Sequence, residues 1–168
     1  IHNLAGKVVS NVTFIFFGSP GAVTFFLYGS NNVFAFAANT GNFNARISAW
    51  DDCSLSISDF AVSGGTRIEL ASSEIVVGQG ALFADETLLQ SHDGHGIVDL
   101  RSNEIINKGR GRIEIGKHVW IGRRATILKD VTIVSWSRHR DIINEEERMF
   151  FAGLSEDEQE PSEKYITG

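Results

Sequence analysis

Residues 115–133 read IGKHVW, IGRRAT, ILKDVT and a final isoleucine, so one pattern returns every six residues. The inward-type positions are the first and the fifth of each block: Ile115, Ile121 and Ile127, then Val119, Ala125 and Val131. A helix repeats about every 3.6 residues and a simple strand every two, whereas a solenoid coil of short strands and tight corners carries a longer repeat. The stretch therefore predicts a β-solenoid with the isoleucines inside.

The same register is present further upstream. Val77, Phe83 and Leu89 stand at successive first positions, and the next first position holds His95 instead of an aliphatic residue. Residues 96–114 then carry no repeat and contain glycines and mixed charges. This break predicts an excursion loop at 96–114 that leaves the solenoid between two regular coils, with His95 at its mouth.

The stretch 81–133 resembles the hexapeptide-repeat acyltransferases, and among them it is most similar to the sugar and capsular-polysaccharide O-acetyltransferases. The resemblance rests on HDGHGIVD at 92–99 and IGKHVWIG at 115–122. In that family a histidine precedes an excursion loop, and a Val-Trp-Ile-Gly coil follows it. The resemblance covers roughly a third of the chain. It implies a left-handed parallel β-helix that assembles as a homotrimer, with active sites between adjacent subunits.

The predicted fold class is all-β: a left-handed parallel β-helix with an excursion loop and a short C-terminal helix. We assign 1–134 to the β-helix domain and 135–168 to the helix and an acidic tail. Within the first domain, 1–62 alternates strand-like runs with Gly, Ser, Asn and Pro turns. We favour degenerate coils that cap the solenoid over a small antiparallel sheet, because terminal repeats are usually atypical.

The repeat stops at Ile133, where the family continues through further coils. Trp136 and Arg140 follow almost at once, in a pattern that resembles the segment after the solenoid in some polysaccharide O-acetyltransferases. Either residues between 133 and 135 are absent, or the chain is naturally shortened. The further coils of the family would normally carry part of the coenzyme A site. Residues 141–153 have one apolar side and predict a helix.

Charge is uneven along the chain. The formal net charge is −6, and 141–168 alone holds nine acidic and two basic residues. No basic stripe favours nucleic acid, and no run approaches the ~18 apolar residues of a membrane span. The single cysteine, Cys53, cannot form an internal disulfide. A lone cysteine is typical of a reducing compartment, and we predict a cytoplasmic location.

His95 is the candidate general base. A hydroxyl must lose its proton as it attacks a thioester, and a neutral histidine can accept that proton near neutral pH. The glycines Gly94 and Gly96 flank His95, and the residue replaces an aliphatic one in the register. The alternative is a turn histidine without a role, which is also the favoured interpretation of His92.

The resemblance implies further site residues in the coil after the loop. It places Trp120 beside His95 in the catalytic groove, where the indole packs on the acetyl donor or the sugar. It also implies acetyl-CoA as co-substrate, with Trp120, Gly122 and Ala125 along the pantetheine arm and with Arg123 and Lys129 near the phosphates. The alternatives are that the small residues serve the coil and that the charges are solvated.

The predicted function is acetyl-CoA-dependent O-acetylation of a carbohydrate hydroxyl, on a surface polysaccharide or a sugar precursor, without a metal. One alternative is a zinc enzyme of the γ-carbonic anhydrase type, because the histidines at 92, 95 and 118 are potential zinc ligands. Another is a non-catalytic solenoid used for assembly or glycan binding. Metal content and the effect of His95→Ala distinguish the three.

Overall fold

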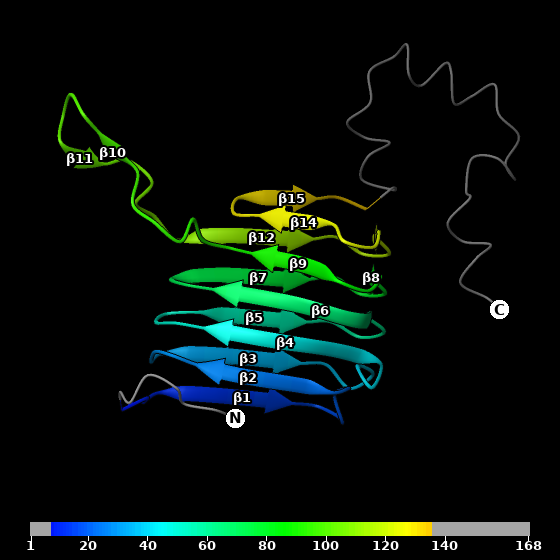
Figure 1. Ribbon diagram of the computed structural model, residues 1–168. Coiled ribbons are helices and arrows are strands. Elements are labelled where there is room, and N and C mark those ends of the chain that lie inside the picture. The colour runs from blue at the N-terminus through cyan, green and yellow to red at the C-terminus, as the bar shows by residue number, and fades with distance from the viewer. Residues whose placement is uncertain (1–7, 136–168) are drawn as a thin grey trace, which may run out of the picture.

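The computed structural model describes residues 8–135, and in this range the chain forms strands and turns without a helix. The strands wind into a column of stacked coils, from β1 at one end to β15 at the other (Figure 1). Pairing between coils is parallel, and the antiparallel pair β10–β11 stands apart from the column. The predicted left-handed parallel β-helix is therefore confirmed for the described residues.

The first sheet takes one strand from each of six coils. These strands are β1 (Val12–Phe16), β3 (Asn32–Phe36), β5 (Ser54–Ile57), β7 (Ser73–Val77), β12 (Gly111–Ile115) and β15 (Val131–Ile133). At the N-terminal end Val12 pairs with Asn32, 20 positions on, whereas Ile113 pairs with Val131, 18 positions on. The C-terminal coil thus holds three blocks of six residues, and the N-terminal coils are longer.

The second sheet completes each coil. Its strands are β2 (Val23–Leu27), β4 (Phe43–Ala49), β6 (Val62–Leu70), β8 (Leu82–Phe83), β9 (Thr87–Gln90), β13 (Trp120–Ile121) and β14 (Thr126–Leu128). Strand β6 pairs with β8 through Val62 and Ser63, and with β9 through residues 66–69. The intervening Gly64 and Gly65 mark the point at which one long side of the coil divides into two.

The corners are built from residues in the left-handed region of φ. The corner that leads into the first sheet holds five such residues, with φ between 45° and 62°: Asn11, Asn31, Asp52, Ser72 and Asp130. Asn and Asp adopt this conformation more readily than most residues. Asn11 donates through Nδ2 to Asn31 Oδ1 at 3.1 Å, and Asn31 donates to Asp52 Oδ1 at 3.0 Å. The corners of successive coils are therefore held together by a side-chain ladder.

One continuous core fills the column. The apolar first-position residues of the repeat between 77 and 127 are buried: Val77, Phe83, Leu89, Ile115, Ile121 and Ile127. In the longer N-terminal coils the interior is aromatic, with Phe34 stacked on Phe14 and tilted against Phe25. Larger coils enclose more volume, and the larger rings fill it. Cys53 is also buried, and this burial raises the pKa of its thiol.

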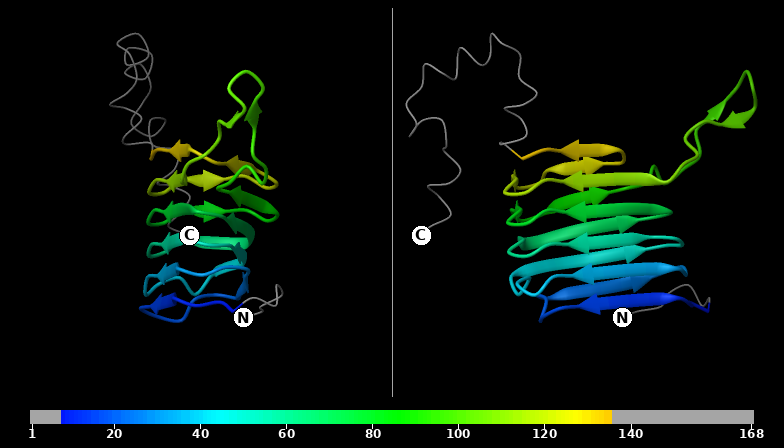
Figure 2. Two further views of the ribbon diagram at one scale, coloured as in Figure 1. Left: turned by 90° about the vertical axis from the view of Figure 1, so that its left-hand side faces the viewer. Right: turned by 180° about the vertical axis from the view of Figure 1, so that it is seen from behind.

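The excursion lies between β9 and β12. Ser73 pairs with Gly111, 38 positions on, so about twenty residues are inserted relative to the 18-residue coil. The inserted chain carries the short hairpin β10 (Val98–Asp99) and β11 (Glu104–Ile105), which projects away from the column (Figure 2). Residues 111–114, which we placed in the loop, belong to β12. Ile113 points into the core there, so the solenoid resumes earlier than its charged residues indicated.

Other expectations concern the two ends of the chain. The strands between 12 and 57 pair in parallel, so this region forms coils and not an antiparallel sheet. The predicted helix at 141–153 and the acidic tail lie outside the described residues. Residues 8–135 contain no helix with the length and apolarity that a bilayer crossing requires.

Candidate active site

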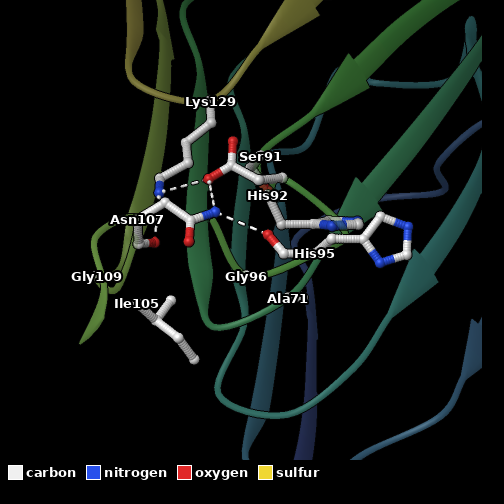
Figure 3. Close-up of a pocket in the computed structure, with 10 residues that line it drawn as sticks. Ala71, Ser91, His92, His95, Gly96, Ile105, Asn107, Gly109 and Lys129 are labelled. Atoms are coloured by element: carbon white, nitrogen blue, oxygen red, sulfur yellow. Dashed lines mark hydrogen bonds and ion pairs between the residues drawn. The ribbon is translucent and has the colours of Figure 1, made fainter. Parts of the chain in front are cut away.

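A pocket of about 200 Å³ lies at the base of the excursion, where the chain leaves β9 and returns to β12. Its wall combines both ends of the loop with the corners of neighbouring coils. The lining residues are Ala71, Ser91, His92, Asp93, His95, Gly96, Ile105, Asn107, Gly109 and Lys129. His95 and Lys129, which are 34 positions apart in the chain, are the two predicted site residues that the fold brings together here (Figure 3).

A polar network braces the base of the loop. Asn107 donates through Nδ2 to Asp93 Oδ2 at 2.9 Å and to the carbonyl of His95 at 2.8 Å, and its Oδ1 accepts from the Ile97 amide at 2.8 Å. Lys129 Nζ lies 3.1 Å from the same Asp93 oxygen. The bonds from Asn107 and Lys129 hold the pKa of the Asp93 carboxyl below its usual range. The carboxylate is therefore charged near neutral pH and ties the outgoing and returning strands of the loop together.

The His95 side chain is exposed at the edge of this network. Its carbonyl is fixed by Asn107, whereas its imidazole has no hydrogen-bond partner within residues 8–135. In Figure 3 the ring points away from Lys129, on the other side of the braced loop base. Neither nearby carboxylate orients the ring, because Asp93 is engaged as above and Asp99 accepts from the Arg101 amide within its turn. His95 thus has a fixed backbone and an accessible side chain.

His92 has a different environment from the turn histidine that we favoured. It is half-buried, and its ring meets the Trp50 indole at a centroid distance of 5.5 Å and an interplanar angle of 65°. The Gly94 amide donates to His92 Nδ1 at 3.0 Å, so we assign the hydrogen of the neutral ring to Nε2. Nε2 is buried without a hydrogen-bond partner among the described residues.

Trp120 lies at the opposite end of the coil. It opens β13, after the corner that follows β12, and its side chain is 77% exposed. His95 precedes β12 and Trp120 follows it, so the two are separated by at least the length of a five-residue strand, about 16 Å at ~3.3 Å per residue. Within one copy of the chain, the fold does not bring the two predicted catalytic residues together.

The remaining predicted cofactor residues divide between these two ends. A Cβ built on Gly122 would meet nothing within 4 Å, and its φ is not positive, so neither packing nor backbone strain requires glycine there. Ala125 is half-buried against the core. Arg123 donates to Glu86 at 2.7 Å and is therefore paired. Lys129 belongs to the His95 pocket, and its side chain is only 15% exposed.

Two residues at the site, Asn107 and Trp50, were not identified from the sequence. Asn107 lies among loop residues without a repeat, and nothing in its surroundings identifies it as the brace of the His95 backbone. Trp50 contacts His92 from two coils away in the stack, 42 positions earlier in the sequence. This contact becomes predictable only when the lengths of the intervening coils are known.

Gly111→Ala tests the junction between loop and solenoid. A Cβ at position 111 would overlap the carbonyl oxygen of Ser91, and backbone cannot move aside cheaply. We expect a loss of about 1–3 kcal/mol in the free energy of unfolding, which is the usual cost of overpacking. Urea denaturation followed by circular dichroism measures it. Gly65→Ala is the matched control, because a Cβ there meets nothing within 4 Å. Equal losses in both variants would contradict the assigned contact.

Comparison with known proteins adds to this geometry. The chain is 36% identical over 104 residues to the polysialic acid O-acetyltransferase of Neisseria meningitidis, an alignment that covers 61% of this chain and 48% of that protein. It is 30% identical over 68 residues to the polysialic acid O-acetyltransferase of Escherichia coli O1:K1, covering 40% of this chain and 22% of that protein. The chain therefore spans about half the length of the Neisseria meningitidis protein and a smaller part of the Escherichia coli protein. No family model matches.

A solved structure shares the fold. The crystal structure of the polySia-specific acetyltransferase NeuO superposes with a TM-score of 0.52 at 20% identity, over 74% of this chain and 68% of that one. At this identity the superposition establishes the solenoid fold alone. With the sequence matches, the repeat and the observed coils in agreement, the predicted resemblance to the hexapeptide-repeat acyltransferases, and among them to the polysaccharide O-acetyltransferases, is confirmed.

Proposed function

We propose that this chain forms the catalytic solenoid of an O-acetyltransferase that moves an acetyl group from acetyl-CoA to a hydroxyl of a surface polysaccharide. The observation that carries the proposal is the exposed imidazole of His95, which has no partner among residues 8–135, beside a braced loop at a break in the repeat. The names of the relatives make polysialic acid the first acceptor to test. The predicted cytoplasmic location remains a prediction.

In the proposed reaction His95 is the general base. A neutral imidazole nitrogen accepts the proton of the sugar hydroxyl while the hydroxyl oxygen attacks the thioester carbonyl. The tetrahedral intermediate then collapses, the C–S bond breaks, and the proton held by the histidine passes to the departing thiolate. The oxyanion requires a donor such as a backbone N–H group. The acetyl group thereby moves directly, without an acyl-enzyme intermediate.

The proposed place for the acetyl donor is the exposed side of β13. Trp120 offers a large exposed ring, and the open space over Gly122 leaves the backbone accessible to a narrow chain such as pantetheine. Arg123 and Arg124 both contact Glu86, whose pKa they lower, so a phosphate near them would compete with that carboxylate. Lys129 is not proposed as a phosphate ligand, because it already pairs with Asp93.

A complete site requires more than one copy of the chain, and we propose a homotrimer. The pocket of about 200 Å³ is smaller than the roughly 300–1,000 Å³ of ligand sites that enclose a small molecule. His95 and Trp120 also lie at opposite ends of β12, so that two copies packed side by side could join them. The excursion hairpin supports such an assembly, since it exposes Ile97, Leu100 and Ile106 at its surface.

The zinc hypothesis has less support. Between residues 8 and 135 no three His, Cys, Asp or Glu side chains gather closely enough in one chain to hold a metal ion. His118 lies at the far corner of the coil from His92 and His95, packed over Gly80. Metal analysis of the purified assembly remains the measurement that distinguishes a zinc hydratase from a transferase.

The test is thiol release from acetyl-CoA in the presence of polysialic acid and a panel of other polysaccharides and sugars. We expect release that depends on an acceptor and an acetyl ester on the product. The thermal unfolding midpoint should rise when coenzyme A is added, because a ligand that binds the folded state stabilises it. The absence of release with every acceptor, together with an unchanged midpoint, would favour the non-catalytic glycan-binding solenoid.

A further inference from the structure

The outer surface of the second sheet bears a group of rings over β2 and β4. Residues 25, 27, 47 and 49 point into the core, so the alternate residues of these strands point outward. Besides Thr24, Asn44 and Ser48, the outward residues of the two strands and of the positions directly after them are three aromatic residues and one arginine. We call these four the aromatic face: Phe26, Tyr28, Arg46 and Trp50. Trp50 is 38% exposed. Such a cluster on the surface of a solenoid indicates a binding surface more often than isolated exposed residues do.

The aromatic face leads to the His95 pocket. Tyr28 and Trp50 stack at a centroid distance of 4.9 Å and an angle of 19°, and Trp50 in turn contacts His92. Positions 28, 50, 71 and 92 follow register partners in successive coils, so they form one row parallel to the solenoid axis. Ala71 and His92, the last two members of the row, line the pocket. The row therefore continues the pocket wall across the neighbouring coils.

A positive charge accompanies the rings. The Arg46 guanidinium lies 4.3 Å from the centroid of Phe26, and Arg46 forms no ion pair within residues 8–135. Arg67, its register partner in the next coil, is by contrast paired with Glu69. A guanidinium stacked on a ring keeps its N–H edge free for a planar anion such as a carboxylate. The aromatic face thus offers apolar ring surface and one available cation.

We propose that the aromatic face binds the acceptor polymer, as an acidic polysaccharide laid along the solenoid axis with its reacting sugar in the His95 pocket. This inference rests on the proposed acetyl transfer to a polysaccharide. The aromatic rings contact the C–H surfaces of successive sugars, and Arg46 pairs with a sugar carboxylate. The row from position 28 to 92 crosses three coil spacings, about 14 Å at ~4.8 Å each. It therefore extends beyond the reacting sugar, and the face favours polymers over short acceptors.

The test compares acceptor lengths in the native chain and in Tyr28→Ala and Arg46→Gln. Neither Tyr28 nor Arg46 lines the pocket. Trp50 contacts His92, which does line the pocket, so Trp50→Ala is a supporting variant and does not decide the test. Acetyl transfer is measured with polysialic acid and with a short sialic acid oligomer. We expect the ratio of kcat/KM for the polymer to that for the oligomer to fall about tenfold in each variant, chiefly through the KM for the polymer. Phe17→Ala, an exposed ring after β1, is the matched control and should leave the ratio unchanged.

Several results would overturn the inference. An unchanged ratio would show that the face does not meet the polymer, and an equal loss for both acceptors would indicate damage to the pocket. A variant that changes the sedimentation coefficient would assign the face to contacts between copies. Direct binding of polysialic acid to the His95→Ala chain, with and without Tyr28→Ala, separates this inference from the proposed reaction. A polymer that binds equally well to both chains contradicts the inference even if transfer itself is observed.

Discussion

His95→Ala should lower acceptor-dependent thiol release about 10²–10⁴-fold, the range that a positioned general base contributes. The expected loss lies in kcat, because the imidazole removes a proton in the transition state and adds little to the binding of either substrate. The fold should persist, since the side chain is exposed and has no hydrogen-bond partner in the described part of the chain. Circular dichroism and the sedimentation coefficient should therefore match those of the native protein.

The matched control is His118→Asn. His118 is also exposed, but it lies at the corner before Trp120, with φ at 54°, a conformation that asparagine tolerates. This variant should retain most of the activity. A loss below about tenfold in His95→Ala would assign the base to another residue. If the site is shared between copies, mixing His95→Ala chains with Trp120→Ala chains, after unfolding and refolding together, should give more activity than either variant alone.

Phe34→Ala should cost about 3–5 kcal/mol in the free energy of unfolding, the range for removal of a large buried aromatic side chain. Phe34 is fully buried and packs against Phe14 and Phe25, so the substitution opens a cavity in the middle of the N-terminal coils. The neighbouring backbone cannot close that cavity, because it is fixed by parallel pairing on both sides. Urea denaturation measures the loss.

Val33→Ala is the control for this prediction. Val33 precedes Phe34 in the same strand but points outward and is 41% exposed, so its truncation should change stability by less than about 1 kcal/mol. Because backbone pairing joins each coil only to its neighbours, unfolding can begin at the N-terminal coils alone. Similar losses for the two variants would contradict the assignment of Phe34 to the core.

The sequence predicted the register of the coils only where the coil length is a multiple of six residues. From Ile115 onward the register identifies the inward residues, and the first-position residues Ile115, Ile121 and Ile127 are buried, whereas Ile133 is partly buried. Two fifth-position residues, Ala125 and Val131, are only partly buried, because they lie in the C-terminal part of the described column. In the N-terminal coils Val23 pairs with Ala45, 22 positions on. A period of this kind is not a multiple of six, so the sequence alone indicated strands and turns there without their register.

The predicted parts of the site were similarly those tied to the repeat. His95 was identifiable because it replaces an aliphatic residue at a register position. The end of the loop was misplaced because Arg112 and Glu114 resemble loop residues, whereas in β12 they point outward and pair with each other and, in the case of Arg112, with Glu74. The contacts from Asn107 and Trp50 depend on how the loop folds back and on how coils stack. The spacing of residues along the sequence predicts neither the fold of the loop nor the stacking of coils of unequal length.

The junction of Ser91 with Gly111 has a consequence for how this protein can vary. About twenty residues enter and leave the column there, yet β12 pairs with β7 as though the chain were uninterrupted. The scaffold therefore constrains only the two ends of the insert. Closing a longer insert adds only about 0.6 kcal/mol for each doubling of its length. During evolution the hairpin can therefore be exchanged or extended, and the side chains that it presents to a sugar can change with it. The stability of the fold comes from the coils, whose pairing is the same whatever the insert contains.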